Sequence, residues 1–219
     1  MADPVATRRA YSTGRITNGG LGMAQIPVID YRAYNDDAPG GDIHVRYHSF
    51  SMRERLRKAN GDAANQVMLV EDQRYGLYNT ESPLLQHAIR ELDRWITNIR
   101  HDPRHRVAAN RPASLREGCN TRGEQPKFIA ETQRRDPSTR CEQLYPSASF
   151  AREVAGAGVA ADIVKCLLKP IDPADYRVTL TDAELARLRG IFPDGVCDWS
   201  RPGVDQRPPD GTWLSFGPP

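Results

Sequence analysis

Two short apolar runs, each followed by a segment with helical features, constrain the fold more than any other part of the sequence. The runs cover 26–31 and 66–70, and runs of this length predict short buried strands. The helical segments cover 51–60 and 83–99. Strands that alternate with helices favour a parallel α/β layer. We therefore predict an α/β fold whose clearest order lies within residues 26–100.

Capping signals mark the ends of both helical segments. Ser51 and Glu54 have the spacing of a capping box, and Gly61 is a good C-terminal stop. Ser82 followed by Pro83 is typical of an N-cap and a first helical position. The second helix is expected to bury one stripe of side chains at helical spacing, made of Leu85, Ala88, Ile89, Leu92, Trp95, Ile96 and Ile99.

The segments on either side of this region lack such patterns. Residues 1–25 are polar and Gly-rich, so we expect a loop or a truncated start there. Residues 101–158 contain five prolines and no apolar period. A loop of this length is uncommon in a compact domain. We expect a long irregular loop, which a disulfide ties down or which packs against partner sequence.

The C-terminal part, 159–219, is expected to hold a short helical region and an extended tail. Thr181 and Glu184 form a second capping box. The tail carries Trp199 and Trp213 as candidate anchors on a surface, and a partly ordered terminus is the alternative. The helix is expected to turn three apolar side chains inward: Leu185, Leu188 and Ile191.

Composition and missing motifs exclude several classes of protein. Thirty basic and 28 acidic residues leave a net charge of +2, which argues against nucleic acid as a partner. The apolar runs are too short for a membrane span. G-x-S-x-G, Walker A, H-E-x-x-H and C-x-x-C motifs are absent, and the glycines at 14–22 lack dinucleotide-binding spacing. We therefore expect neither a cofactor nor a metal.

The four cysteines suit two disulfides between sequence neighbours. The simplest pairing joins Cys119 to Cys141 and Cys166 to Cys197. Such bonds would stabilise the Pro- and Gly-rich half of the chain, which is least able to build a core. The alternative is free buried thiols in a cytosolic protein. Disulfides imply export, and since no signal peptide is recognisable here, they point to lost upstream sequence.

The densest group of reactive side chains lies between the first strand and the first helix. It includes Asp42, His44, Arg46 and His48. In an α/β protein this position is the carboxyl end of the sheet, where ligands and catalytic residues gather. A carboxylate can orient an imidazole, which then takes a proton from a nucleophile. The candidate base is His48 or His44, and the candidate acid is Asp42 or Asp30.

Other interpretations of the same residues stay open. Asp36 and Asp37 are alternative acids, and both also fit ordinary turn positions. In a purely structural interpretation Asp42 caps the helix, one of the two histidines packs under the sheet, and Arg46 is solvated.

Three separated stretches carry a resemblance to a known family. They are Gly41-Asp-Ile-His-Val-Arg-Tyr-His-Ser-Phe-Ser-Met-Arg-Glu-Arg-Leu56, Val164-Lys-Cys-Leu-Leu-Lys-Pro-Ile-Asp172 and Ile191-Phe-Pro-Asp-Gly-Val-Cys-Asp-Trp-Ser-Arg-Pro-Gly203. Together they resemble the bacterial family catalogued as domain of unknown function 6351. The resemblance implies a longer, exported protein of α/β-hydrolase-like plan. This chain would then be its C-terminal part, with the nucleophile elbow in the missing N-terminal part.

In the position of its histidines, the sequence departs from the residue order expected of an α/β-hydrolase. If the two predicted strands were the last two of such a sheet, the catalytic histidine would fall within 71–82, and that stretch has none. Either 26–31 is the last catalytic strand and His44 or His48 is the base, or the triad has decayed, or the family never used one. We favour the first.

The sequence thus predicts the C-terminal portion of an α/β-hydrolase-like sheet, followed by an irregular, disulfide-tied region. The expected function is part of an extracellular or periplasmic enzyme of esterase or depolymerase type, acting on a small-molecule or polymeric ester. Alone the chain would be inactive, because it lacks a nucleophile elbow. The alternative is a non-catalytic binding or structural module.

Overall fold

The computed structural model describes residues 3–16, 18–76 and 80–211. The chain divides into two compact units. The larger unit comprises residues 18–155 and 159–161, and the smaller one comprises residues 1–17, 156–158 and 162–219. Each unit is described by itself below.

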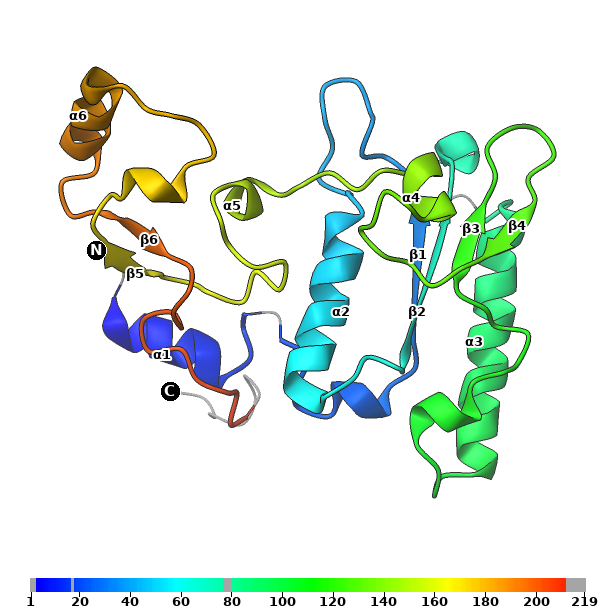
Figure 1. The fold of residues 1–219 in the computed structure, drawn as a ribbon. Coiled ribbons are helices and arrows are strands. Elements are labelled where there is room, and N and C mark those ends of the chain that lie inside the picture. Colours follow the sequence, from blue (N-terminus) through cyan, green and yellow to red (C-terminus); the bar gives the residue numbers. More distant parts are fainter. Residues whose placement is uncertain (1–2, 17, 77–79, 212–219) are drawn as a thin grey trace. The chain divides into compact units, whose positions relative to one another are not determined.

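A four-stranded sheet organises the larger unit (Figure 1). Its strands β1 (Val28–Ala33), β2 (Gln66–Glu71), β3 (Gly118–Asn120) and β4 (Phe128–Ala130) lie in the order β1-β2-β3-β4. The first three are parallel, and β4 is antiparallel to β3. The predicted alternation of strand, helix, strand and helix is confirmed, in a mixed rather than purely parallel sheet.

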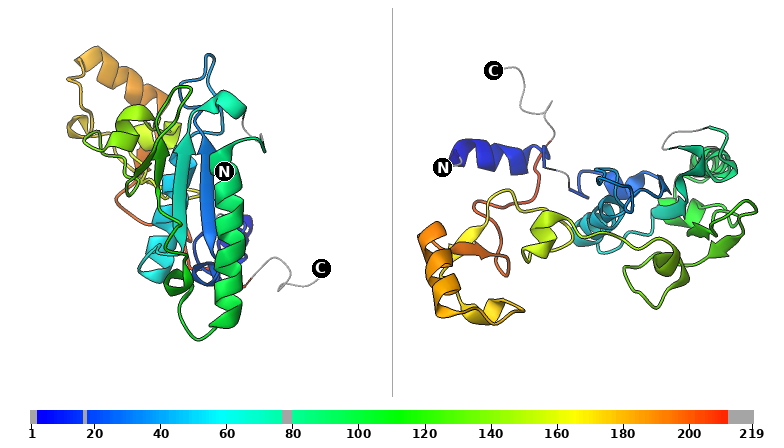
Figure 2. Two further views of the ribbon diagram at one scale, coloured as in Figure 1. Left: turned by 90° about the vertical axis from the view of Figure 1, so that its right-hand side faces the viewer. Right: turned by 90° about the horizontal axis from the view of Figure 1, so that it is seen from above.

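Helices α2 (Tyr47–Asn60) and α3 (Pro83–His101) cover opposite faces of this sheet (Figure 2). Alternate residues of a strand point to opposite faces. Val67 and Leu69 of β2 pack with Trp95 of α3 in one core cluster. On the other face, Ser49 of α2 donates a hydrogen bond of 3.0 Å to Asp30 of β1.

Helix α3 begins where the sequence predicts, because Ser82 caps the backbone N–H of Leu85 at 3.0 Å. Its buried face differs from the predicted stripe. The buried positions are Leu84, Ala88, Glu91 and Trp95, whereas Ile89 is 56% exposed. The prediction for Ile89 is therefore wrong. The buried face of α3 includes Glu91, which the spacing of apolar residues alone does not predict.

Helix α2 ends at Gly61 as predicted, with Gly61 in the left-handed conformation. Its start does not follow the prediction, because the helix begins four residues before Ser51. The N-cap is Arg46, which provides no side-chain cap. The Ser51 hydroxyl instead donates to the carbonyl oxygen of Val159 at 2.5 Å. Ser51 and Glu54 do not act as a capping box.

The segment 101–158 is more ordered than a long irregular loop. It supplies strands β3 and β4, the short helices α4 (Arg140–Leu144) and α5 (Ala151–Val154), and a 3-10 turn at Val107–Asn110. Outside this segment, two further 3-10 turns of the larger unit lie at Met23–Gln25 and Gln73–Tyr75. Cys119 and Cys141 are joined by a disulfide and belong to a second buried cluster, with Tyr34, Val70 and Tyr145. The disulfide that was predicted to tie down this segment is therefore present.

The smaller unit contains helix α1 (Pro4–Ser12), the antiparallel pair β5 (Leu167–Lys169) and β6 (Val196–Asp198), a 3-10 turn (Pro173–Asp175) and helix α6 (Asp182–Ile191). Helix α1 contradicts the expected loop over 1–25, since Asp3 caps its first turn and Tyr11 is buried. The predicted disulfide between Cys166 and Cys197 is present.

The capping box of Thr181 and Glu184 is also present, at the start of α6. Of the three side chains expected inward, Leu185 and Leu188 are half-buried, whereas Ile191 is 54% exposed. Trp213 lies outside the described residues. Within the part of the chain that the structure describes, no helix is long and apolar enough to cross a membrane.

Candidate functional site

The loop between β1 and α2 carries most of the candidate residues. It leaves the carboxyl end of β1 after Ala33 and enters α2 at Tyr47. Asp36, Asp42, His44 and Arg46 all lie on it. The predicted position, at the carboxyl end of a parallel strand, is therefore correct for this group.

Asp42 and His44 form a close pair within this loop. The Asp42 Oδ1 atom lies 2.6 Å from His44 Nδ1 and accepts a second hydrogen bond of 2.6 Å from the His44 backbone N–H. These contacts lower the pKa of the Asp42 carboxyl, with the backbone N–H as the largest cause and the imidazole contributing further. With Nδ1 donating to the carboxylate, the basic nitrogen of the ring is Nε2. This is the arrangement of an oriented general base.

His48 is held differently. Its Nε2 atom lies 3.1 Å from the carbonyl oxygen of Ile43 and is placed to donate to it. Its ring also lies edge-on to the neighbouring Tyr47 ring, at 5.7 Å between centroids. Among the described residues, no carboxylate forms a hydrogen bond or ion pair with His48. Of the two predicted bases, only His44 is paired with a carboxylate of the described residues.

The Asp30 carboxylate interacts with residues other than the two histidines. Its carboxylate accepts hydrogen bonds from Arg32 Nε at 3.1 Å and Ser49 Oγ at 3.0 Å. These partners lie on the sheet face that α2 covers. No contact between Asp30 and either histidine occurs in the described ranges. The structure therefore pairs His44 with Asp42 rather than Asp30.

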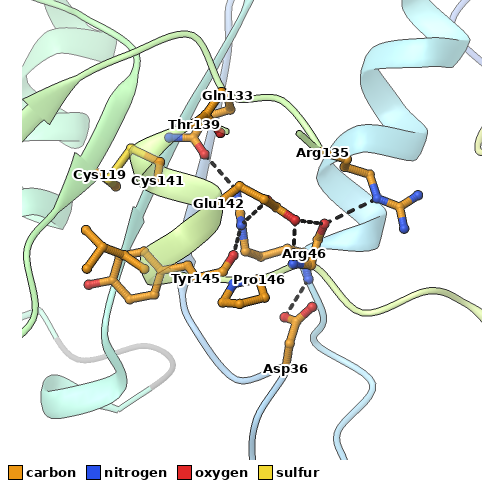
Figure 3. Close-up of polar contacts among 12 residues, drawn as sticks. Asp36, Arg46, Cys119, Gln133, Arg135, Thr139, Cys141, Glu142, Tyr145 and Pro146 are labelled. Carbon is orange, nitrogen blue, oxygen red and sulfur yellow. Dashed lines mark hydrogen bonds and ion pairs between the residues drawn. A yellow bond between two sulfur atoms is a disulfide. The ribbon is translucent and has the colours of Figure 1, made fainter. Parts of the chain in front are cut away.

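Arg46 is a buried residue, and Figure 3 shows the polar contacts of its side chain. Its side chain is 3% exposed, and its Nη1 atom donates to Glu142 Oε2 at 2.8 Å and to the carbonyl oxygen of Tyr145. Its Nη2 atom donates to Gln133 Oε1 at 2.7 Å. Burial lowers the pKa of the guanidinium, and the charge of Glu142 opposes that effect. Arg46 is not solvated.

The backbone of Arg46 is also fixed. Its N–H donates to Asp36 Oδ1 at 2.8 Å, and the other Asp36 oxygen accepts from the Ala148 N–H at 2.8 Å. Asp36 thus ties the loop of the Asp42–His44 pair to the segment after α4. No sequence signal pointed to Glu142 or Gln133 as the partners, because 87 to 96 residues separate them from Arg46.

A second buried acid lies at the end of β2, in the stretch where a hydrolase-like plan would require a histidine. Glu71 is 2% exposed and accepts hydrogen bonds from Tyr31 Oη at 2.8 Å and Asn120 Nδ2 at 3.0 Å. Ser82 Oγ donates to the same carboxylate. Neutral donors therefore satisfy both oxygens of Glu71, as buried carboxylates require.

Comparison with protein families gives one match. The model of a tannase-like family of unknown function, domain of unknown function 6351, matches residues 1–208. The chain belongs to this family. No curated protein and no solved structure matched the chain. The resemblance expected from the three sequence motifs is confirmed.

For this member of the tannase-like family, the structure confirms a mixed α/β fold and two disulfide pairs. Within the described residues, no group of three or more His, Cys, Asp or Glu side chains is arranged to hold a metal ion. The candidate site therefore consists of the Asp42–His44 pair, with Asp36 and Arg46 holding its loop.

Proposed function

We propose that this chain supplies the acid–base pair of a hydrolase that cleaves ester bonds, with His44 as general base and Asp42 as the acid that orients it. The observation that carries the proposal is the 2.6 Å contact between Asp42 Oδ1 and His44 Nδ1 at the carboxyl end of β1. In this role His44 Nε2 takes the proton from a nucleophilic hydroxyl and later returns it to the leaving alcohol.

The nucleophile would come from a segment outside this chain. The sequence contains no G-x-S-x-G motif, so it offers no recognisable nucleophile elbow. The tannase-like description of the family supports a hydrolase-like relationship. On this proposal the chain is the C-terminal segment of a longer α/β-hydrolase-like enzyme, of esterase or depolymerase type, and is inactive alone.

The two disulfides support an exported enzyme, because such bonds persist in oxidising compartments. An extracellular or periplasmic enzyme would meet small-molecule or polymeric esters. Arg46 is a positioning residue in this scheme. It touches no reacting atom, and it anchors the loop of His44 to Glu142.

The test is hydrolysis of p-nitrophenyl butyrate by the full-length natural protein and by its His44→Gln and His48→Gln variants. A general base contributes about 10²- to 10⁴-fold to the rate. We expect His44→Gln to lower kcat by about that factor and His48→Gln to leave it within a fewfold. Equal activity of folded His44→Gln and wild-type protein would overturn the proposal.

One observation favours the alternative, a non-catalytic binding or structural module. The Asp42 carboxylate also accepts from the His44 backbone N–H, as aspartates do in ordinary turns. If the full-length protein is folded and inert towards esters, this turn is the whole explanation of the Asp42–His44 contact. The chain would then be a binding or structural module.

A further inference from the structure

A cavity of about 880 Å³ opens beside the amino end of β2, at the opposite end of that strand from Glu71. The second half of α2 and the loop that follows it form one side. The segment that leads into β3 and the residues at the end of β4 form the other. We call it the arginine cavity after the four arginines among its lining residues, Arg53, Arg57, Arg111 and Arg116.

The acidic residues of the arginine cavity are all engaged by the protein. Glu117 accepts a two-pronged pair of hydrogen bonds from Arg53, at 2.8 and 2.7 Å. Asp62 accepts from Arg106 at 2.6 Å. Glu131 accepts from the first backbone N–H groups of α4, at 3.1 and 2.8 Å. The cavity therefore offers no uncommitted carboxylate.

Two of the four arginines are not engaged. Arg57 is bound to Glu54 through two hydrogen bonds, of 2.8 and 2.6 Å, and Arg53 is bound to Glu117. Arg111 and Arg116 are exposed. Within the described part of the chain, neither guanidinium group has a hydrogen-bond or ion-pair partner. The arginine cavity thus has two guanidinium groups that form no ion pair with a carboxylate of the described residues.

The remaining lining of the cavity includes a small apolar surface. Its apolar members are mostly short side chains, which leave room for a ligand: Ala63, Ala64, Ala108, Pro112, Ala113, Leu115 and Ala130. A surface of this kind favours an apolar body, and planar guanidinium groups favour a carboxylate, which they bind through paired hydrogen bonds.

We propose that the arginine cavity binds a small organic anion, a carboxylate attached to an apolar body, with Arg111 and Arg116 as its anion-recognising residues. The proposal is independent of the proposed hydrolase function, since the Asp42–His44 pair follows the carboxyl end of β1. The cavity adjoins Gln66, which pairs with Val28 at the amino end of the strands.

The test is a calorimetric titration of this chain with 2-naphthoate and with 2-naphthamide, its uncharged analogue. We expect 2-naphthoate to bind at least about tenfold more tightly, because only the carboxylate gains from the two guanidinium groups. Arg111→Gln and Arg116→Gln should each weaken 2-naphthoate binding about three- to tenfold. Both variants should leave 2-naphthamide binding unchanged.

Arg90→Gln is the matched control, because Arg90 is also exposed and is not among the residues that line the cavity. Its side chain, on α3, has no hydrogen-bond or ion-pair partner among the described residues. Arg90→Gln should leave both affinities unchanged. The proposal is overturned if 2-naphthoate binds no more tightly than 2-naphthamide. It is also overturned if Arg90→Gln weakens 2-naphthoate binding as much as the two cavity variants do, with folding of all variants checked by circular dichroism.

Discussion

Arg46 and Glu142 form a buried ion pair of 2.8 Å across 96 residues of sequence. The pair joins the last residue before α2 to the helix that carries Cys141. Glu142 is itself held by Ser147, whose backbone N–H and hydroxyl both donate to its second oxygen, at 2.8 and 2.5 Å. The loop that presents His44 is thereby fixed to the disulfide-tied part of the larger unit.

Breaking this pair from one side should destabilise the larger unit strongly. Arg46→Met leaves the Glu142 carboxylate buried without its cation, and removal of one partner from a buried pair costs about 3–5 kcal/mol. Urea denaturation checks this expectation.

The double variant Arg46→Met, Glu142→Leu removes both charges and should recover part of the loss. Recovery is incomplete because Gln133, the Tyr145 carbonyl and Ser147 lose their partners. A single variant as stable as the wild type would contradict a buried, energetically coupled pair. The pair would also be contradicted if the free energy of unfolding of the double variant fell by the sum of the losses measured for Arg46→Met and Glu142→Leu alone.

The two disulfides should stabilise the chain to a similar extent. They close loops of 22 and 31 residues, for which the chain-entropy model gives about 3–4 kcal/mol each. We expect Cys119→Ser with Cys141→Ser to lower the melting temperature of the larger unit, and Cys166→Ser with Cys197→Ser that of the smaller unit.

Dithiothreitol provides the control, because it should lower both transitions of the wild type and have no effect on a transition whose cysteines are already replaced. Peptide mapping without reduction checks the pairing itself. A linkage between Cys119 and either Cys166 or Cys197 would contradict it.

The parts of the fold that the sequence predicts are those that local chemistry determines. The runs that become β1 and β2, the Ser82 cap of α3, the Gly61 stop of α2 and the Thr181 capping box all depend on residues a few positions apart. Caps and apolar runs of this kind depend on neighbouring residues, so they can be recognised in the sequence without knowledge of the fold.

The features that the sequence does not predict depend on distant partners. Strands β3 and β4 have three residues each, too few to show alternation, and β3 exists because it pairs with β2. The candidate site shows the same division. Asp42 and His44 are two residues apart, and the sequence alone makes them candidates. The buried position of Arg46 depends on Glu142, which lies on an element that no local sequence pattern connects to Arg46.

Asp42 should titrate below the ordinary range of an aspartate. Its pKa is lowered first by the His44 backbone N–H and further by the His44 imidazole. A carboxyl with a folded-state pKa below its unfolded value of about 3.9 contributes stability above that value and loses it as pH falls through the folded pKa. The Asp42–His44 contact should therefore persist through mildly acidic pH.

Carboxyl carbon NMR of Asp42 measures this shift, with Asp42→Asn to assign the signal. In His44→Ala the backbone N–H remains, so the pKa of Asp42 should rise only part of the way towards 3.9. A complete return in His44→Ala would show that the imidazole, rather than the turn, is the main cause. An unshifted Asp42 in the wild type would contradict the contact.

Ser82 should be among the most sensitive single positions of the larger unit. Its hydroxyl accepts from the Leu85 N–H at 3.0 Å as the N-cap of α3 and donates to buried Glu71. Ser82→Ala removes both interactions and leaves Glu71 with fewer donors, so we expect a loss of about 1–3 kcal/mol in urea denaturation. The exposed cap Thr181 is the comparison, and Thr181→Ala should destabilise α6 by about 1 kcal/mol.

Ser82→Asp separates the two roles of this hydroxyl. An aspartate caps a helix as well as a serine does, but here it places a second carboxylate beside Glu71, at a position that is 0% exposed. If capping alone mattered, Ser82→Asp would be as stable as the wild type. We expect it to be at least as destabilised as Ser82→Ala at neutral pH and to recover part of the loss as pH falls, because protonation of one carboxyl removes the repulsion.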